Sequence, residues 1–144
     1  MTDEQIRLVK TSFAKVEPVE EEAAVLFYAW LFHLDPELRP LFKNDIREQG
    51  HKLMRMLKLA VEGLERPAAL VPAVRALGAR HAGYGVKEKD YETVAAALLW
   101  MLEKALPDSF TAETKAAWIA AYQMLASVMK DGAREPAEAA AGLG

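Results

Sequence analysis

Apolar residues recur every three or four positions along nearly the whole chain. Ile6, Val9 and Phe13 follow this spacing near the N-terminus, and Leu98 and Met101 follow it later. This period places the apolar side chains on one face of an α-helix, whereas a half-buried strand would alternate every second residue. The sequence shows no strand pattern and no internal repeat. We therefore expect an all-α protein of packed helices.

Capping residues and prolines predict where these helices begin and end. Thr2 with Gln5 forms a capping box, and Asp35 precedes Pro36 at the start of a short helical turn. Thr111 is expected to cap the last helix, and Pro72 to restart the helix in which it lies. Residues 43–45 are expected to form a loop. The later helices are predicted at about 46–64, 67–82, 88–106 and 111–130, with residues 1–131 as one domain and 132–144 as a frayed tail.

Length, charge and cysteine content exclude several classes of protein. The 144 residues suit one domain, and a hydrophobic fraction of 52% supplies a core. A net charge of −3 gives no basic surface for nucleic acid, and no apolar run of about 18 residues could span a membrane. The chain has no cysteine, which excludes disulfides and thiolate ligation of iron. The acidic N-terminus is no secretory signal, so a cytoplasmic location fits best.

His81 is the residue that points most directly to chemistry. It continues an apolar stripe formed by Leu70, Val74 and Leu77. A lone histidine in that setting is by default a hydrogen-bonded core residue. The chain offers no cysteine and no second histidine at helical spacing, so a zinc site is not supported. A single imidazole suits a metal whose other ligands come from a cofactor, as in haem.

Other polar and sulfur-containing residues have structural interpretations. His33, near a helix end, and His51, about 200° around its helix from Gln49, are predicted to lie at the surface. Glu20–Glu22 are predicted to form the solvated first turn of a helix. The methionines fall at helical spacings as core residues, with Met56 also a candidate for a pocket wall or axial ligand. The inner face of the helix from Ile46 is predicted to comprise Ile46, Gln49, Leu53, Met56, Leu57, Ala60 and Leu64.

Several motifs in a fixed order resemble those of globins. They are Leu26-Phe27-Tyr28, Pro36 through Phe42, Gln49 through Leu53, His81 through Val86, and Tyr91. The chain resembles most closely the single-domain bacterial haemoglobins and the globin half of flavohaemoglobins, from about Thr2 to Met129. This resemblance implies a globin fold around haem b.

The resemblance also implies a role for each matching residue. His81 is similar to the proximal ligand of the haem iron, and Tyr28 and Gln49 to the distal pair that hydrogen-bonds a bound gas. Tyr91 looks like a tyrosine that joins the proximal histidine and a glutamate in a hydrogen-bonded network. Residues expected to contact the haem are Phe42, Leu53, Met56, Leu77, His81, Val86 and Tyr91.

The chain departs from the flavohaemoglobin pattern in two ways. Ala133 stands where the family carries the glutamate of that network, about eleven residues after Tyr122. A carboxylate partner would make the imidazole more basic, so its absence disfavours peroxidase-like or dioxygenase chemistry. No flavin or nicotinamide domain is expected in the chain, so turnover would need electrons from a separate reductase.

These residues lead to three functional hypotheses. The first is a haem protein that binds dioxygen, nitric oxide or carbon monoxide reversibly and tightly, since two distal donors slow release. The second is a nitric oxide dioxygenase that uses a separate reductase, and the third is a gas sensor that acts through a partner protein. The remaining alternative is a helical bundle that binds no haem. In the absence of a gas, the sixth coordination position of the iron is expected to be open or occupied by water. Coordination by His51 is the alternative.

Overall fold

The computed structural model describes residues 1–42 and 45–143, with side chains described up to Arg134. In this part of the chain it contains only helices, which confirms the all-α prediction. The α-helices are α1 (Asp3–Val16), α2 (Glu20–Leu34), α3 (Ile46–Gly63), α4 (Pro67–Gly83), α5 (Glu88–Ala105) and α6 (Ala112–Leu143), and the 3-10 helices are η1 (Glu17–Val19) and η2 (Pro36–Leu41).

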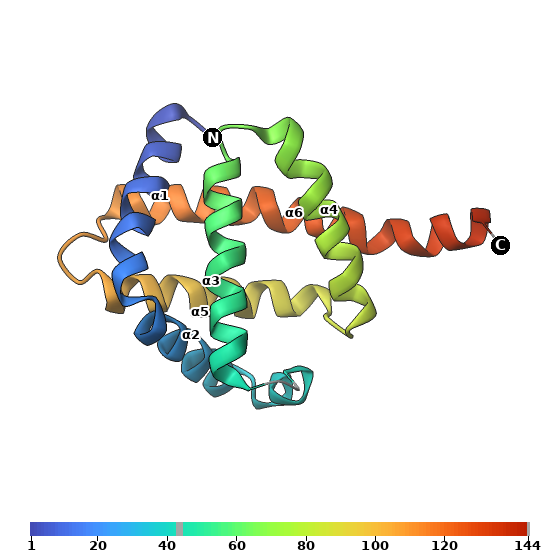
Figure 1. Cartoon of the computed structure of the whole chain (residues 1–144), viewed down its shortest axis with the longest axis horizontal. Helices are drawn as coiled ribbons and strands as arrows, with labels where there is room; N and C mark the ends of the chain where they lie inside the picture. Colours follow the sequence, from blue (N-terminus) through green and yellow to red (C-terminus); the bar gives the residue numbers. More distant parts are fainter. Residues whose placement is uncertain (43–44, 144) are drawn as a thin grey trace.

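The helices cross one another around a single core (Figure 1). α2 packs against α3 and α5, while α6 packs against α1 and α4. The most deeply buried side chains include Leu31, Met101 and Leu102, which come from α2 and α5. This crossed arrangement brings α4, which carries His81, against a helix from the opposite end of the sequence. No helix in the described part of the chain is long and apolar enough to cross a lipid bilayer.

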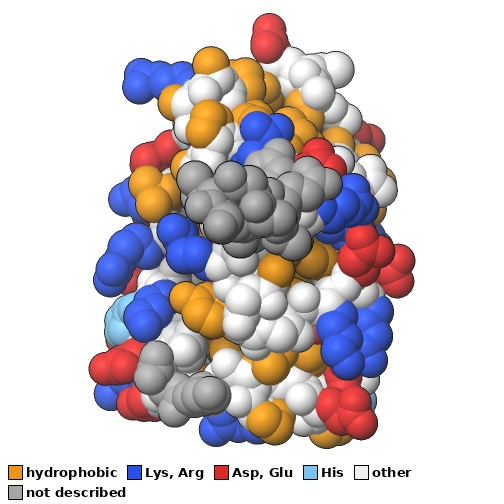
Figure 2. Space-filling view, turned by 90° about the vertical axis from the view of Figure 1, so that its right-hand side faces the viewer, with side chains coloured by type: hydrophobic (Ala, Val, Ile, Leu, Met, Phe, Trp, Pro, Cys, Tyr) orange, Lys and Arg blue, Asp and Glu red, His pale blue; other side chains and the backbone are white. Residues whose placement is uncertain are grey.

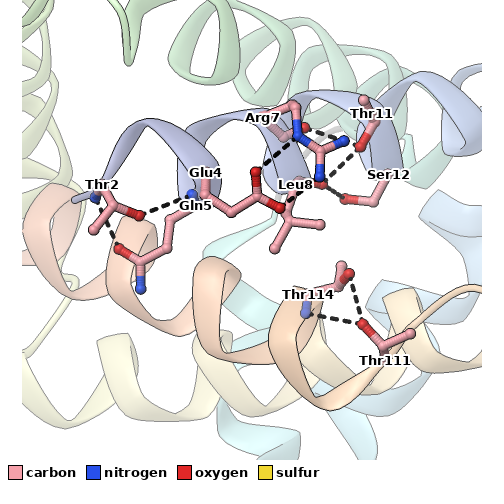
Figure 3. Close-up of polar contacts among 9 residues, drawn as sticks. All are labelled: Thr2, Glu4, Gln5, Arg7, Leu8, Thr11, Ser12, Thr111 and Thr114. Carbon is pink, nitrogen blue, oxygen red and sulfur yellow. Dashed lines mark hydrogen bonds and ion pairs between the residues drawn. The ribbon is translucent and has the colours of Figure 1, made fainter.

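The predicted helix starts are confirmed by their hydrogen bonds. Thr2 and Gln5 form the reciprocal capping box at the start of α1. The Asp35 carboxylate accepts from the Glu37 amide, and the Thr111 hydroxyl accepts from the Thr114 amide (Figure 3). Of the predicted loop, Lys43 and Asn44 lie outside the described residues, and Asp45 caps α3 through the Arg47 amide. Local capping chemistry therefore sets where these helices begin.

Two predicted helix boundaries are wrong. α4 runs without interruption through Pro72, because a single proline removes one backbone hydrogen bond while Leu70 and Val74 on either side remain buried. α6 does not end near Lys130 but continues to Leu143. Gly132 still contacts α4 at Arg75, and the segment after it is rich in Ala and Glu, which favour a helix although they supply few large apolar side chains. Fraying of residues 132–144 stays a prediction.

The predicted inner face of α3 is less deeply buried than its neighbours. Leu64 is buried, but Gln49, Leu53 and the rest of that stripe are only half-buried. The deepest residues of α3 are instead Gly50, Met54 and Val61. An added Cβ at Gly50 would lie 2.9 Å from the Cβ of Ala24, so α2 and α3 approach closely at this point. The predicted stripe therefore lies beside the most deeply buried stripe of α3, and its apolar residues are partly exposed at the edge of the core.

A buried hydrogen bond ties α1 to α6. The indole N–H of Trp118 donates to the hydroxyl of Ser12 over 2.8 Å, and that hydroxyl donates in turn to the Leu8 carbonyl over 2.7 Å. Ser12 and Thr11 are neighbours on α1, but the Thr11 hydroxyl is exposed and bonds carbonyls of its own helix (Figure 3). Ser12 therefore joins two helices, whereas Thr11 does not.

We predict that Ser12→Ala lowers the free energy of unfolding by about 1–3 kcal/mol, because the buried indole N–H of Trp118 loses its acceptor. Thr11→Ala is the matched control and should stay within about 0.5 kcal/mol of the wild type. Urea unfolding of the three proteins measures both values. Equal stabilities for the two variants would contradict the prediction.

Candidate functional site

The imidazole of His81 is oriented by its own helix. Its Nδ1 lies 2.9 Å from the carbonyl oxygen of Leu77, one turn earlier in α4. Burial lowers the pKa of the half-buried ring, and the Leu77 hydrogen bond opposes this shift only in part. The ring is therefore neutral near pH 7, with its proton on Nδ1 and its lone pair on Nε2. That is the tautomer in which a histidine binds a metal through Nε2.

The turn after His81 brings the predicted haem-contact segments together. The amide of Val86 donates to the His81 carbonyl over 3.1 Å, and Gly85 adopts a φ of 92°, which favours glycine. A Cβ on Gly85 would lie 3.7 Å from the side chain of Leu41. The end of α4 therefore lies beside η2, and Phe42 directly follows η2.

Tyr28, Gln49 and Phe42 form a cluster where α2, α3 and the end of η2 meet. The Tyr28 hydroxyl donates to the main-chain carbonyl of Gln49 over 3.2 Å. The Tyr28 ring packs edge-on against Phe42, with centroids 5.3 Å apart. Only 4% of Tyr28 is exposed, and this burial raises the pKa of its hydroxyl to about 12. The hydroxyl is therefore a protonated hydrogen-bond donor throughout the physiological range.

Phe32 also belongs to this cluster, although it was not among the site residues predicted from the sequence. It stacks on Tyr28 at 5.9 Å and meets Phe42 edge-on at 5.5 Å. The Arg39 guanidinium lies 5.3 Å from the Phe32 ring and donates to the Phe42 carbonyl over 3.3 Å. The spacing of four residues between Tyr28 and Phe32 could have placed both on one helix face.

The remaining predicted contact residues are half-buried or buried. Leu53 and Met56 on α3, Leu77 on α4 and Val86 after it are all half-buried. Figure 2 shows hydrophobic side chains in the middle of one face of the molecule, with charged side chains mainly along its sides. A separate surface hollow of about 540 Å³ lies between α2 and α3, lined by residues such as Val25, Ile46 and His51. None of the predicted contact residues lines it.

The contacts of Tyr91 in the structure involve its ring and its main chain. It is buried, with the Lys130 ammonium 5.5 Å from its ring centroid. Its main-chain carbonyl accepts a 2.5 Å hydrogen bond from Tyr122, whereas the hydrogen bond of His81 goes to Leu77. Ala133 is half-buried on α6 and supplies no carboxylate. The imidazole is therefore held by a backbone carbonyl.

The other histidines lie where they were predicted. His33 and His51 are exposed, and His33 stacks on Trp30 with ring centroids 4.7 Å apart. Glu20–Glu22 form the first turn of α2. Among the described residues, no group of three His, Cys, Asp or Glu side chains could hold a bare metal ion. Among the histidines of this part of the chain, His81 is thus the one that is at least half-buried and could serve as a metal ligand inside the protein.

Comparison with known proteins decides the family. The family model described as Globin matches residues 25–129, which is most of the chain. The chain belongs to the globin family. The match includes the cluster of Tyr28, Gln49 and Phe42 as well as His81, and the all-α architecture of this globin agrees with it.

Curated relatives of this globin are named flavohemoproteins. The chain is 28% identical over 134 residues to one from Vibrio cholerae, with 91% of this chain and 34% of the relative covered. It is 31% identical over 100 residues to one from Xylella fastidiosa strain 9a5c, with 67% of this chain and 25% of the relative covered. The globin therefore spans a quarter to a third of the length of these relatives.

A solved structure shows the same fold. It is an engineered carbene transferase, provisionally assigned as a nitric oxide dioxygenase from Rhodothermus marinus. It superposes with a TM-score of 0.86 at 26% identity, covering 98% of this chain and 99% of that one. The two chains therefore share one fold over nearly their whole lengths.

The raised pKa of Tyr28 predicts how stability depends on pH. Between pH 10, where an unfolded tyrosine ionises, and about pH 12, the folded chain keeps this hydroxyl protonated, so stability falls as pH rises. From pH 9 to pH 11.5 the wild type should lose about 2 kcal/mol more unfolding free energy than Tyr28→Phe. Urea unfolding at both values measures this difference. Tyr84→Phe is the control, because Tyr84 is 66% exposed, and it should lose as much as the wild type. An equal loss in all three proteins would contradict the prediction.

Proposed function

We propose that this globin is a haem protein that binds dioxygen, and also nitric oxide and carbon monoxide, reversibly at ferrous iron. The observation that carries the proposal is the neutral imidazole of His81, whose Nδ1 is held by Leu77 so that Nε2 carries the lone pair. We propose His81 as the metal ligand and haem b as the cofactor. The flavohemoprotein names of its relatives support haem as the group concerned.

The described residues fit such a group. One imidazole is too few ligands for a bare metal ion, and the chain contains no cysteine for thiolate or thioether attachment. A porphyrin supplies four nitrogens of its own and needs a mostly apolar setting. The half-buried faces of α3 and α4 provide such surfaces through Leu53, Met56 and Leu77. Phe42, Val86 and Tyr91 are proposed to contact the same group.

Tyr28 and Gln49 are proposed to stabilise the gas. When haem is bound, its ferrous iron supplies the site at which a diatomic gas coordinates. A protonated hydroxyl would stabilise partial negative charge on a gas bound there by donating a hydrogen bond to it. Burial keeps the Tyr28 hydroxyl protonated, and it lies against α3 at Gln49. Donation to a bound gas would replace the present hydrogen bond of this hydroxyl to the Gln49 carbonyl.

A nitric oxide dioxygenase that works with a separate reductase is the second candidate function. The Rhodothermus structure, provisionally assigned to that activity, favours it. The absence of a carboxylate at Ala133 favours simple gas binding, because the proximal imidazole then gains no added basicity. Nitrate formed over many turnovers with a flavin reductase would support the enzyme. A single stoichiometric burst would support the gas-binding protein.

We predict that Tyr28→Phe speeds dioxygen dissociation from the haem-loaded protein by about ten- to a hundredfold. A hydrogen bond to a charged group contributes about 1.5–3 kcal/mol, and about 1.4 kcal/mol corresponds to tenfold. Gln49→Leu should also speed dissociation if its amide donates. Stopped-flow measurement of the dissociation rate tests both variants. Tyr84→Phe is the control, and a rate in Tyr28→Phe equal to that of the control would remove Tyr28 from the site.

A further inference from the structure

The backbones of α4 and α6 touch directly at two glycines. Gly78 is buried, and a Cβ added to it would overlap the Met129 carbonyl oxygen and lie 2.6 Å from the Met129 carbonyl carbon. Gly132 is buried in the same way, and its Cβ would overlap the Arg75 carbonyl oxygen and lie 2.7 Å from the Arg75 carbonyl carbon. All of these neighbours are backbone atoms, so no side-chain rotation relieves the overlap. We call these two contacts the α4–α6 joint.

The α4–α6 joint lies beside the groups that orient His81. Gly78 directly follows Leu77, whose carbonyl holds the imidazole Nδ1, and it precedes His81 by three residues, about one helical turn. Because α4 is a continuous helix here, any separation of α4 from α6 at Gly78 moves the Leu77 carbonyl and the imidazole together. Gly132 forms the reciprocal contact and directly precedes Ala133.

We propose that Gly78 and Gly132 are positioning residues that set where His81 presents its Nε2. This proposal rests on the proposed function, in which His81 binds haem iron. The resemblance implies a glutamate on α6 as the partner of the imidazole, but this chain has Ala133 at that position. The α4–α6 joint instead holds the two helices together by backbone packing. It thereby fixes the distance of α4 from the rest of the globin without adding a charge near the imidazole.

The test compares Gly78→Ala and Gly132→Ala with Gly83→Ala. Gly83 lies on the same helix, two residues after His81, and an added Cβ there would meet nothing within 4 Å. Each variant is examined without haem by circular dichroism and by the ¹⁵N shifts of the His81 ring. It is then loaded with haem, and haem affinity and the iron–histidine stretching band are measured by absorption and resonance Raman spectroscopy.

We expect both joint variants to stay helical, to change the ¹⁵N shifts of His81, to shift the iron–histidine band and to weaken haem binding by about tenfold or more. Gly83→Ala should match the wild type in every measurement. Wild-type ring shifts, band and affinity in the joint variants would overturn the proposal. Equal changes in Gly83→Ala would also overturn it, since they would follow from any change in α4.

Three further outcomes are distinct. If one joint variant fails to fold, the other decides the proposal. If neither folds, the joint is a requirement for folding and the positioning role is overturned. If the wild type takes up no haem, the proposed function fails, whereas the ¹⁵N shifts still show whether the joint orients the imidazole.

Discussion

The hydrogen bond from the His81 ring to the Leu77 carbonyl is the interaction on which the site depends. It selects the tautomer with a free lone pair on Nε2 and restricts rotation of the ring. It exists because α4 is helical from Leu77 through His81, so that the Leu77 carbonyl lies one turn before the ring. A backbone carbonyl accepts this bond without a full charge, so the imidazole stays neutral and gains little basicity.

The cluster of Tyr28, Gln49 and Phe42 depends on a different constraint, the close crossing of α2 and α3 at Ala24 and Gly50. This crossing buries Tyr28 against Phe42 and brings its hydroxyl to α3. The same crossing buries Gly50 and Met54 and leaves Leu53, on the adjacent stripe of α3, half-buried. Partly exposed apolar surface of this kind commonly marks a binding site.

The sequence predicts those features whose cause is local. The caps at Thr2 and Thr111 follow from side-chain chemistry within one turn, and the apolar period identifies the helices. Features decided by distant packing were not predictable: the continuity of α4 through Pro72 and the depth of each α3 face. The end of α6 was predicted at Lys130 because few large apolar residues follow it, but the Ala- and Glu-rich composition of that segment favours a helix, and α6 continues to Leu143. The resemblance to globins pointed to Tyr28, Gln49 and His81 as site residues. The hydrogen bond from Tyr28 to the Gln49 carbonyl could not be predicted, because it depends on how α2 and α3 pack in the folded chain. Gly78 and Gly132 carry no sequence signal of their contact, because a glycine does not reveal its neighbour.

The most direct test of the account is the ferrous absorption spectrum of haem-loaded His81→Ala, recorded with and without added imidazole. The account predicts that the variant loses the histidine-ligated spectrum of the wild type and regains it when imidazole fills the space of the missing ring. His51→Ala, which changes an exposed histidine, should keep the wild-type spectrum. An unaltered spectrum in His81→Ala without imidazole would show that another group binds the iron and would contradict the account.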